Sequence, residues 1–366
     1  MSNSENFTHA LSIAIQARVN TLVMGDPGGG KSALVYAISK KLGMHCNTFV
    51  GACRLPEDIG GYPVSDLANN RIKLLPVGDW LNFPEGKPGT LFIDEFGSNV
   101  PAMQAALMRV SWERKAGDVA IPDNISIVAA GNPPETAANA NDIAAPLANR
   151  FLHLPWATDV NAVIQGFIEA WPEPKVLRLP ANWQDEQNMV RSLVASFLRA
   201  LPQHTHAVPK DESKRSEPWP SPRSWYSLFI PAVAAGRAAG ASDDVIAMLG
   251  AGAVGPGVAQ EFLSWLRKMD LPNPLDLLKD PKKFKLFDRQ DKNFAVLNSV
   301  VAAALNDLSP ENWVAAWTIM AHSAKEGHVD IATAAVRALA RARKVSFPNI
   351  TPMLKPFLPL LDAAGL

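Results

Sequence analysis

Eight consecutive residues near the start of the chain have the composition of a phosphate-binding loop. Residues 25–32 read Gly-Asp-Pro-Gly-Gly-Gly-Lys-Ser and fit the pattern G-x-x-x-x-G-K-[ST]. The glycines let successive backbone N–H groups point inward around phosphate oxygens, at a helix N-terminus that already favours anions. Lys31 would reach the β- and γ-phosphates, and the Ser32 hydroxyl would ligate Mg²⁺. The residues expected to contact a nucleotide are Gly25, Asp26, Pro27, Gly28, Gly29, Gly30, Lys31, Ser32 and Ala33.

Two acidic residues follow an apolar run that has the length of a buried strand. Residues 90–93 read Thr-Leu-Phe-Ile and lead directly into Asp94 and Glu95. In phosphoryl transfer to water, Asp94 would hold Mg²⁺ through its water shell, and Glu95 would orient and polarise the attacking water. An acidic strand end is common by itself. Its position after a phosphate loop favours the catalytic interpretation.

Three further polar residues could act on the same phosphates. Asn132 ends another apolar run, residues 125–130, and its amide could donate to the γ-phosphate or to the attacking water. Arg150 and Arg223 carry guanidinium groups, which suit the charge of a transferring phosphoryl group. Each has an ordinary alternative, because Gly-Asn-Pro is more often a turn signal and a lone arginine is as often a surface side chain.

The elements that would position these residues alternate between strands and helices. Residues 7–18 and 33–42 have helical spacing, and residues 21–24, 90–93 and 125–130 are strand-like. Strands separated by helices predict parallel crossovers, and ligands collect at the carboxyl ends of such strands. After about residue 155 the chain is rich in Ala and Leu. Helices are expected over residues 189–201, 225–240, 258–269, 294–308 and 331–344, with a polar loop at 202–222.

The sequence therefore predicts an α/β fold with a parallel sheet, followed by an all-helical region. The expected domains are residues 1–170, which bind nucleotide, and residues 171–366, which are helical. Residues from about 245 onward carry no recognisable motif.

Charge and cysteine content exclude several classes of protein. The 366 residues carry 35 Lys+Arg against 35 Asp+Glu, so the basic surplus typical of nucleic-acid binders is missing. Residues 279–292 are locally basic around Phe284 and Phe287, which we interpret as a solvated helical face. The 2 cysteines cannot build a disulfide framework or a zinc site. No stretch is typical of a signal peptide or a membrane span, so a soluble protein of the cytoplasm is expected.

Together these residues resemble the AAA+ ATPases over roughly residues 7–240. The phrases Ser221-Pro222-Arg223 and Asn149-Arg150-Phe151 look like the MoxR branch of that family. The resemblance implies that residues 25–32 are Walker A, that Asp94 and Glu95 are Walker B, and that Asn132 is sensor 1. It also implies a helix 2 insert over residues 62–81 and a pre-sensor 1 insert over residues 112–122, with Gly117 and Asp118 at a hairpin tip. Asn149 departs from the aspartate that commonly precedes the finger arginine.

The resemblance also implies a function, a ring-forming Mg²⁺-dependent ATPase that converts ATP to ADP and phosphate. Such rings, typically hexamers, remodel, activate or assemble a partner protein in the manner of a chaperone, and the partner typically carries a von Willebrand factor A domain. Arg150 would be the finger that enters the next subunit's site, and Arg223 would be sensor 2 in its own. On this basis the catalytic residues are Lys31, Asp94, Glu95, Asn132, Arg150 and Arg223, and the metal ligands are Ser32 and Asp94.

Two other functions fit the same residues. One is a motor stimulated by nucleic acid, or a restriction-type subunit similar to McrB, whose binding would weaken steeply with salt. The other is a structural or regulatory subunit that binds nucleotide with little turnover, although the paired acids Asp94 and Glu95 argue against it.

Overall fold

The computed structural model describes residues 3–133, 143–169, 171 and 173–365. The chain forms two compact units. The first consists of Met1–Trp183 and His206–Gln260, and the second of Gln184–Thr205 and Glu261–Leu366. In sequence order, segments of the two units alternate along the chain. The domain boundary at residue 170 that the sequence analysis expects stays a prediction.

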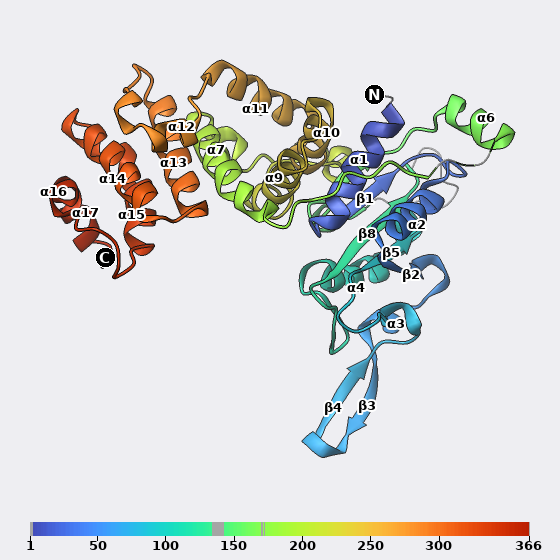
Figure 1. Cartoon of the computed structure of the whole chain (residues 1–366). Coiled ribbons are helices and arrows are strands. Elements are labelled where there is room, and N and C mark those ends of the chain that lie inside the picture. The colour runs from blue at the N-terminus through green and yellow to red at the C-terminus, as the bar shows by residue number, and fades with distance from the viewer. Residues whose placement is uncertain (1–2, 134–142, 170, 172, 366) are drawn as a thin grey trace. The chain divides into compact units, whose positions relative to one another are not determined.

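The first unit is built on a five-stranded parallel sheet. Its strands are β1 (Thr21–Met24), β2 (His45–Val50), β5 (Gly89–Asp94), β8 (Ile125–Gly131) and β9 (Leu152–Pro155), in the order β2-β5-β8-β1-β9 (Figure 1). The central strands are buried along almost their whole length, which explains their continuous apolar runs. All five strands run the same way, so the loops after β1, β5 and β8 meet at one edge of the sheet.

Helices of the first unit cover this sheet. Helix α1 (Asn3–Gln16) packs against β1, β8 and β9, and α2 (Lys31–Leu42) packs against β2, β5 and β8. Helix α4 (Pro101–Trp112) adds Met103, Leu107 and Val110 to the core. Helix α2 begins immediately after Gly30 and is followed immediately by Gly43, and both glycines have left-handed backbone angles that other residues rarely adopt.

Two hairpins extend from this framework. The antiparallel pair β3 (Tyr62–Asp66) and β4 (Arg71–Leu75) follows the short helix α3 (Pro56–Gly60) and projects beyond the sheet (Figure 1). The smaller pair β6 (Lys115–Ala116) and β7 (Val119–Ala120) turns at Gly117 and Asp118, as the sequence predicts. A carboxylate oxygen of Asp118 accepts a 2.7 Å hydrogen bond from the Leu74 N–H, so the two hairpins are joined.

The remaining elements are helical, and the predicted fold class is confirmed for the described residues. In the first unit, α8 (Pro222–Ser224) continues through a π-helical turn (Trp225–Phe229) into α9 (Ile230–Ala238), and α10 (Asp243–Val254) packs on β9. Helix α6 (Val160–Ile168) follows β9. Helix α11 (Pro256–Met269) runs from the first unit into the second.

The second unit contains α7 (Glu186–Ala200), α12 (Pro274–Lys279), α13 (Gln290–Asn306), α14 (Pro310–Lys325), α15 (Val329–Arg341), α16 (Thr351–Leu354) and α17 (Leu358–Asp362). Its core is centred on Trp313 and Trp317, which are fully buried. Among the described helices, none combines the length and the apolar character that crossing a membrane requires.

Candidate nucleotide site

The phosphate loop after β1 is shaped by glycines at positions where a side chain would be strained or crowded. Gly28 and Gly30 have φ angles of 75° and 84°. A Cβ on Gly25 would lie 2.5 Å from the carbonyl oxygen of Trp156, and a Cβ on Gly29 would lie 2.8 Å from Oγ1 of Thr158. The Trp156 indole also donates a 2.6 Å hydrogen bond to the Gly29 carbonyl, so the chain after β9 holds the loop in place.

Lys31 is the buried charge at the centre of this loop. Its ammonium group donates to the carbonyl oxygens of Gly25 (2.7 Å) and Asp26 (2.8 Å) and to Oδ1 of Asn132 (2.8 Å). Burial lowers the pKa of Lys31, and the nearby carboxylates of Asp94 and Asp26 partly oppose that shift. A cation held among oxygen acceptors is well suited to exchange one of them for a phosphate oxygen.

The acidic end of β5 lies against the first turn of α2. The Ser32 hydroxyl donates a 2.8 Å hydrogen bond to Oδ2 of Asp94, and Oδ1 of Asp94 accepts from the Glu95 N–H at 2.9 Å. Glu95 is exposed and has a left-handed φ of 56°, an uncommon conformation for a residue with a side chain. The strand order puts β8 between β1 and β5, so Asn132 lies between the loop and the acids.

These oxygen atoms fit Mg²⁺ in the presence of a phosphate. Ser32 and Asp94 supply a hydroxyl and a carboxylate, which are ligand types that this ion prefers. No group of three or more His, Cys, Asp or Glu residues that could hold a metal occurs in the described part of the chain. A Mg²⁺ ion here would therefore take further ligands from water and phosphate, as is usual for nucleotide sites.

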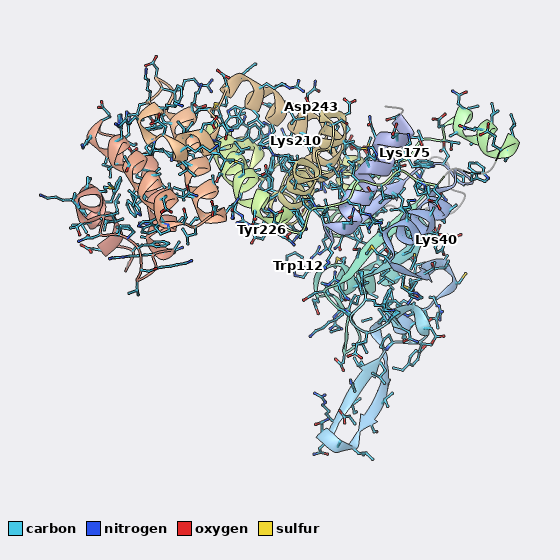
Figure 2. The ribbon with its side chains drawn as sticks, viewed as in Figure 1. Lys40, Trp112, Lys175, Lys210, Tyr226 and Asp243 are labelled. Atoms are coloured by element: carbon cyan, nitrogen blue, oxygen red, sulfur yellow. The ribbon has the colours of Figure 1, made fainter. Side chains whose placement is uncertain are left out.

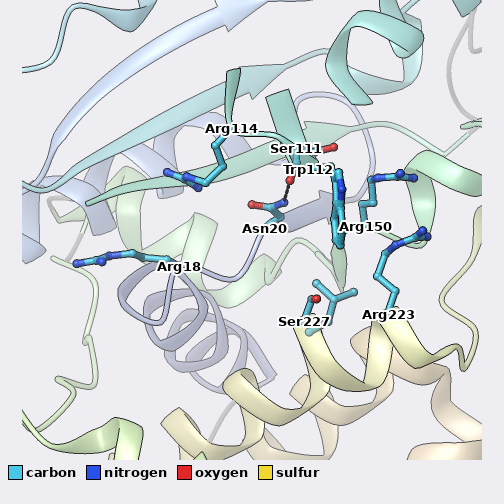
Figure 3. A pocket seen from close by; sticks show the side chains of 9 residues that line it. Arg18, Asn20, Ser111, Trp112, Arg114, Arg150, Arg223 and Ser227 are labelled. Carbon is cyan, nitrogen blue, oxygen red and sulfur yellow. Dashed lines mark hydrogen bonds between the residues drawn. The ribbon is translucent and has the colours of Figure 1, made fainter. Parts of the chain in front are cut away.

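Arg150 and Arg223 lie together, next to the same tryptophan ring. Their guanidinium carbons are 5.7 Å and 5.4 Å from the centroid of Trp112 (Figure 3). Arg150 also donates to the Pro146 carbonyl oxygen. Burial lowers the pKa of Arg150, and the neighbouring charge of Arg223 lowers it further. The Nε atoms of both arginines are buried and have no hydrogen-bond partner among the described residues.

This arginine pair lies at the edge formed by the amino ends of the strands, opposite the edge formed by their carboxyl ends, where the phosphate loop lies. It borders a cavity of about 200 Å³ that Arg18 and Asn20, the residues just before β1, also line (Figure 3). Arg150 precedes β9, which runs parallel to β1 with Leu152 opposite Thr21. The four residues of β1, at about 3.3 Å each, therefore separate this edge from the loop by roughly 13 Å.

The structure thus brings together Lys31, Ser32, Asp94 and Asn132, with Glu95 adjacent, but not Arg150 or Arg223. The role of Arg150 as a finger in another subunit's site stays a prediction. Arg223 lies beside Arg150 and away from its own phosphate loop, and its expected place in the active site stays a prediction. Asn149 links the segment before Arg223 to Arg150, since its Oδ1 accepts from the Ser221 hydroxyl (2.6 Å) and its Nδ2 donates to the Trp219 carbonyl oxygen (3.0 Å).

The departure at Asn149 thereby acquires a structural reason. An aspartate could accept the hydrogen bond from Ser221 but could not donate one to the carbonyl oxygen of Trp219. The Asn149 amide both accepts and donates a hydrogen bond, and it thereby holds the start of α8 beside Arg150. Trp112 and Trp156 were not recognised as site residues from the sequence, because their partners are distant along the chain and no local pattern marks them.

Comparisons with known proteins add little to this geometry. No family model matches the chain, and no curated protein matches it. Among solved structures it is similar to a protein from Cytophaga hutchinsonii described as a candidate ATPase, with 13% sequence identity and a TM-score of 0.42. That similarity covers 72% of this chain and 88% of the other. The residues of the site itself therefore carry the functional conclusion.

Proposed function

We propose that the protein is a Mg²⁺-dependent ATPase of the MoxR type within the AAA+ family, and that it hydrolyses ATP to ADP and phosphate in a ring of identical subunits. The observation that carries this proposal is the division of the site. A phosphate loop with paired acids lies at one edge of the sheet, and two arginines without a phosphate loop lie at the other.

Each residue has a defined task in this reaction. Lys31 and the backbone N–H groups of the phosphate loop would bind the phosphates, and Ser32 and Asp94 would hold a Mg²⁺ ion, which would supply positive charge beside them. Glu95 orients the attacking water and accepts its proton. The water oxygen bonds to the γ-phosphorus as the bond to the ADP oxygen breaks. Asn132 contacts the γ-phosphate, and the arginines stabilise the charge on the transferring group.

The arginines are supplied by the neighbouring subunit. Both lie at the edge of the sheet that is remote from their own loop, which supports a role in trans for Arg223 as well as for Arg150. Coupling each site to its neighbour in this way makes hydrolysis depend on assembly. We further propose, from the sequence resemblance, a hexameric ring in the cytoplasm that remodels a partner protein with a von Willebrand factor A domain.

Mixing of inactive variants tests this assignment. Arg150→Ala and Arg223→Ala subunits are each expected to lose about 10³-fold or more of the hydrolysis rate, since fingers of this kind have effects of that size. Either variant, mixed with Glu95→Gln subunits, is expected to regain activity, because the Glu95→Gln neighbour supplies both arginines to an intact site. The measurement is phosphate release as a function of the mixing ratio.

The control is a mixture of the two arginine variants with each other. When both arginines act in trans, no interface in that mixture supplies both of them, and activity stays absent. If activity recovered in this control but not in the mixture of Arg223→Ala and Glu95→Gln subunits, Arg223 would act in the site of its own subunit. Wild-type rates for Arg150→Ala alone would refute the proposed ring mechanism.

A further inference from the structure

Helix α6 carries an apolar face that no other described element of the first unit covers. Val160, Ile164, Phe167 and Ile168 recur at the spacing of one helical face, and all four side chains are exposed. Trp171, beyond the end of the helix, is exposed as well and packs edge-on against Phe167. Phe167 and Ile168 are each 77% exposed. Figure 1 shows α6 extending from the rest of the first unit with no helix or strand of that unit beside it. A contiguous apolar surface of this kind marks an interaction site.

The start of α6 is fixed to the phosphate loop. Trp156, which donates to the Gly29 carbonyl oxygen, also packs edge-on against Phe7 at 4.8 Å between ring centroids. Three residues later, Asp159 caps α6 by accepting from the N–H groups of Asn161 (3.0 Å) and Ala162 (3.3 Å). The apolar face therefore begins beside the nucleotide site and extends outward from it.

The charges at the two edges of the sheet are complementary. The edge with the phosphate loop carries three carboxylates, those of Asp26, Asp94 and Glu95, against the one ammonium group of Lys31. The cavity at the other edge is lined by Arg18, Arg114, Arg150 and Arg223, and no described acidic residue lines it. Two different, complementary surfaces on one chain favour a head-to-tail contact between copies, which a symmetric contact between like surfaces would not satisfy.

The arginine edge also offers apolar surface. Trp112 and Tyr226 are both exposed and lie on the same side of the first unit (Figure 2). Arg223, three residues before Tyr226, lies over the Trp112 ring. The two arginines are therefore presented within an aromatic surface that could receive an apolar helix face.

We propose that the apolar face of α6 docks onto the Trp112 and Tyr226 surface of a second copy of this chain, and thereby brings that copy's Arg150 and Arg223 to the phosphate loop beside α6. This rests on the proposed function and names the surface that completes its site. A membrane is disfavoured as the occupant, because α6 has no Lys or Arg and is flanked by Asp159 and Glu169, whereas helices that lie on membranes carry basic polar faces.

The experiment measures assembly in a Glu95→Gln background, where bound ATP is not consumed. The test variant is Phe167→Ser with Ile168→Ser. The matched control is Leu67→Ser with Ile72→Ser on the projecting hairpin, where the side chains are 89% and 69% exposed and lie outside the site. Sedimentation velocity with ATP and Mg²⁺ gives the protein concentration at half-assembly, and a fluorescent ATP analogue gives nucleotide affinity under dilute, monomeric conditions.

The α6 variant is expected to require at least tenfold more protein for half-assembly, while its monomer binds the analogue as tightly as the parent. The hairpin variant is expected to match the parent in both measurements. Equal assembly of the α6 variant and the parent would overturn the inference. The inference would also be overturned if the monomer of the α6 variant lost nucleotide affinity as strongly as it lost assembly, since α6 would then cover nucleotide in its own subunit. ATP hydrolysis by a strict monomer of the unsubstituted protein, which keeps Glu95, would instead refute the proposed function.

Discussion

At the residue scale, Trp112 holds two like charges at close range. The guanidinium groups of Arg150 and Arg223 lie over its ring, and each such contact contributes about 0.5–1 kcal/mol at an exposed site. In the proposed ring, Trp112 would therefore be a positioning residue, which aligns both arginines for the neighbouring site.

Trp112→Ala is expected to lower kcat about tenfold, because loss of these contacts removes roughly 1.4 kcal/mol of positioning. KM and the nucleotide affinity of the isolated subunit should change little, and Trp112→Phe should recover part of the rate because it restores an aromatic face. Steady-state kinetics of the assembled protein provide the measurement. A drop in nucleotide affinity without a change in kcat would contradict the positioning role.

The two cysteines differ in environment and should differ in reactivity. Burial raises the pKa of the Cys46 thiol to about 11, whereas Cys53 is exposed. The thiolate is the reactive form, so at pH 8 only about one Cys46 thiol in 10³ is reactive in the folded chain. One equivalent of a thiol reagent is expected to react rapidly, at Cys53, and a second only after unfolding.

The same shift in pKa makes stability depend on pH. The folded state keeps the Cys46 proton up to about pH 11, while the unfolded thiol ionises from about pH 8.5. The free energy of unfolding should therefore fall as pH rises above about 8.5. Cys46→Ala, which has no thiol to ionise, should remove this part of the pH dependence in denaturant titrations.

At the scale of elements, substitutions at two glycines in helices distinguish the effect of packing on stability from the effect of helix propensity. A Cβ on Gly252 in α10 would collide with the carbonyl oxygen of His153 in β9, whereas a Cβ on Gly257 in α11 would meet no atom of another element within 4 Å. Gly252→Ala is expected to destabilise the protein by about 1–3 kcal/mol through overpacking. Gly257→Ala should be neutral or stabilising by up to about 1 kcal/mol, because alanine favours the helix. Denaturant unfolding of both variants checks this contrast, and an equal gain in stability from both would exclude a close contact at Gly252.

Elements that depend on local sequence were predictable, and the relations between distant elements were not. The strand, glycine loop and helix at residues 21–42 form one contiguous signal, and the apolar runs that end at Asp94 and Asn132 are equally local. The Ser-Pro start of α8 was also recognisable, since the Ser221 hydroxyl accepts from the Ser224 N–H. The start of α8, which carries Arg223, is joined to Asn149 by a hydrogen bond from Ser221, and these two residues lie 72 positions apart in the sequence. No local pattern encodes that pairing.

At the scale of the whole molecule, the balance of 35 basic and 35 acidic residues conceals a separation of charge. Arginines line the cavity at one edge of the sheet, and carboxylates lie beside the phosphate loop at the other. The other basic segment, residues 279–292, offers little for stacking bases, because Phe284 is buried and the ammonium group of Lys292 lies 4.1 Å from the Phe287 ring centroid. This distribution favours association between copies of the chain over binding to nucleic acid.

A site completed by a neighbour makes turnover depend on protein concentration. The rate per subunit is expected to fall on dilution, since each dissociated subunit keeps its phosphate loop but loses the arginines of its neighbour. Added salt should shift the fall to higher protein concentration, because it screens the attraction between the charged edges. Nucleotide affinity measured over the same range should stay constant, which separates loss of assembly from loss of folding. A rate per subunit that is unchanged at dilutions where sedimentation finds only monomers would mean that one chain contains the whole active site.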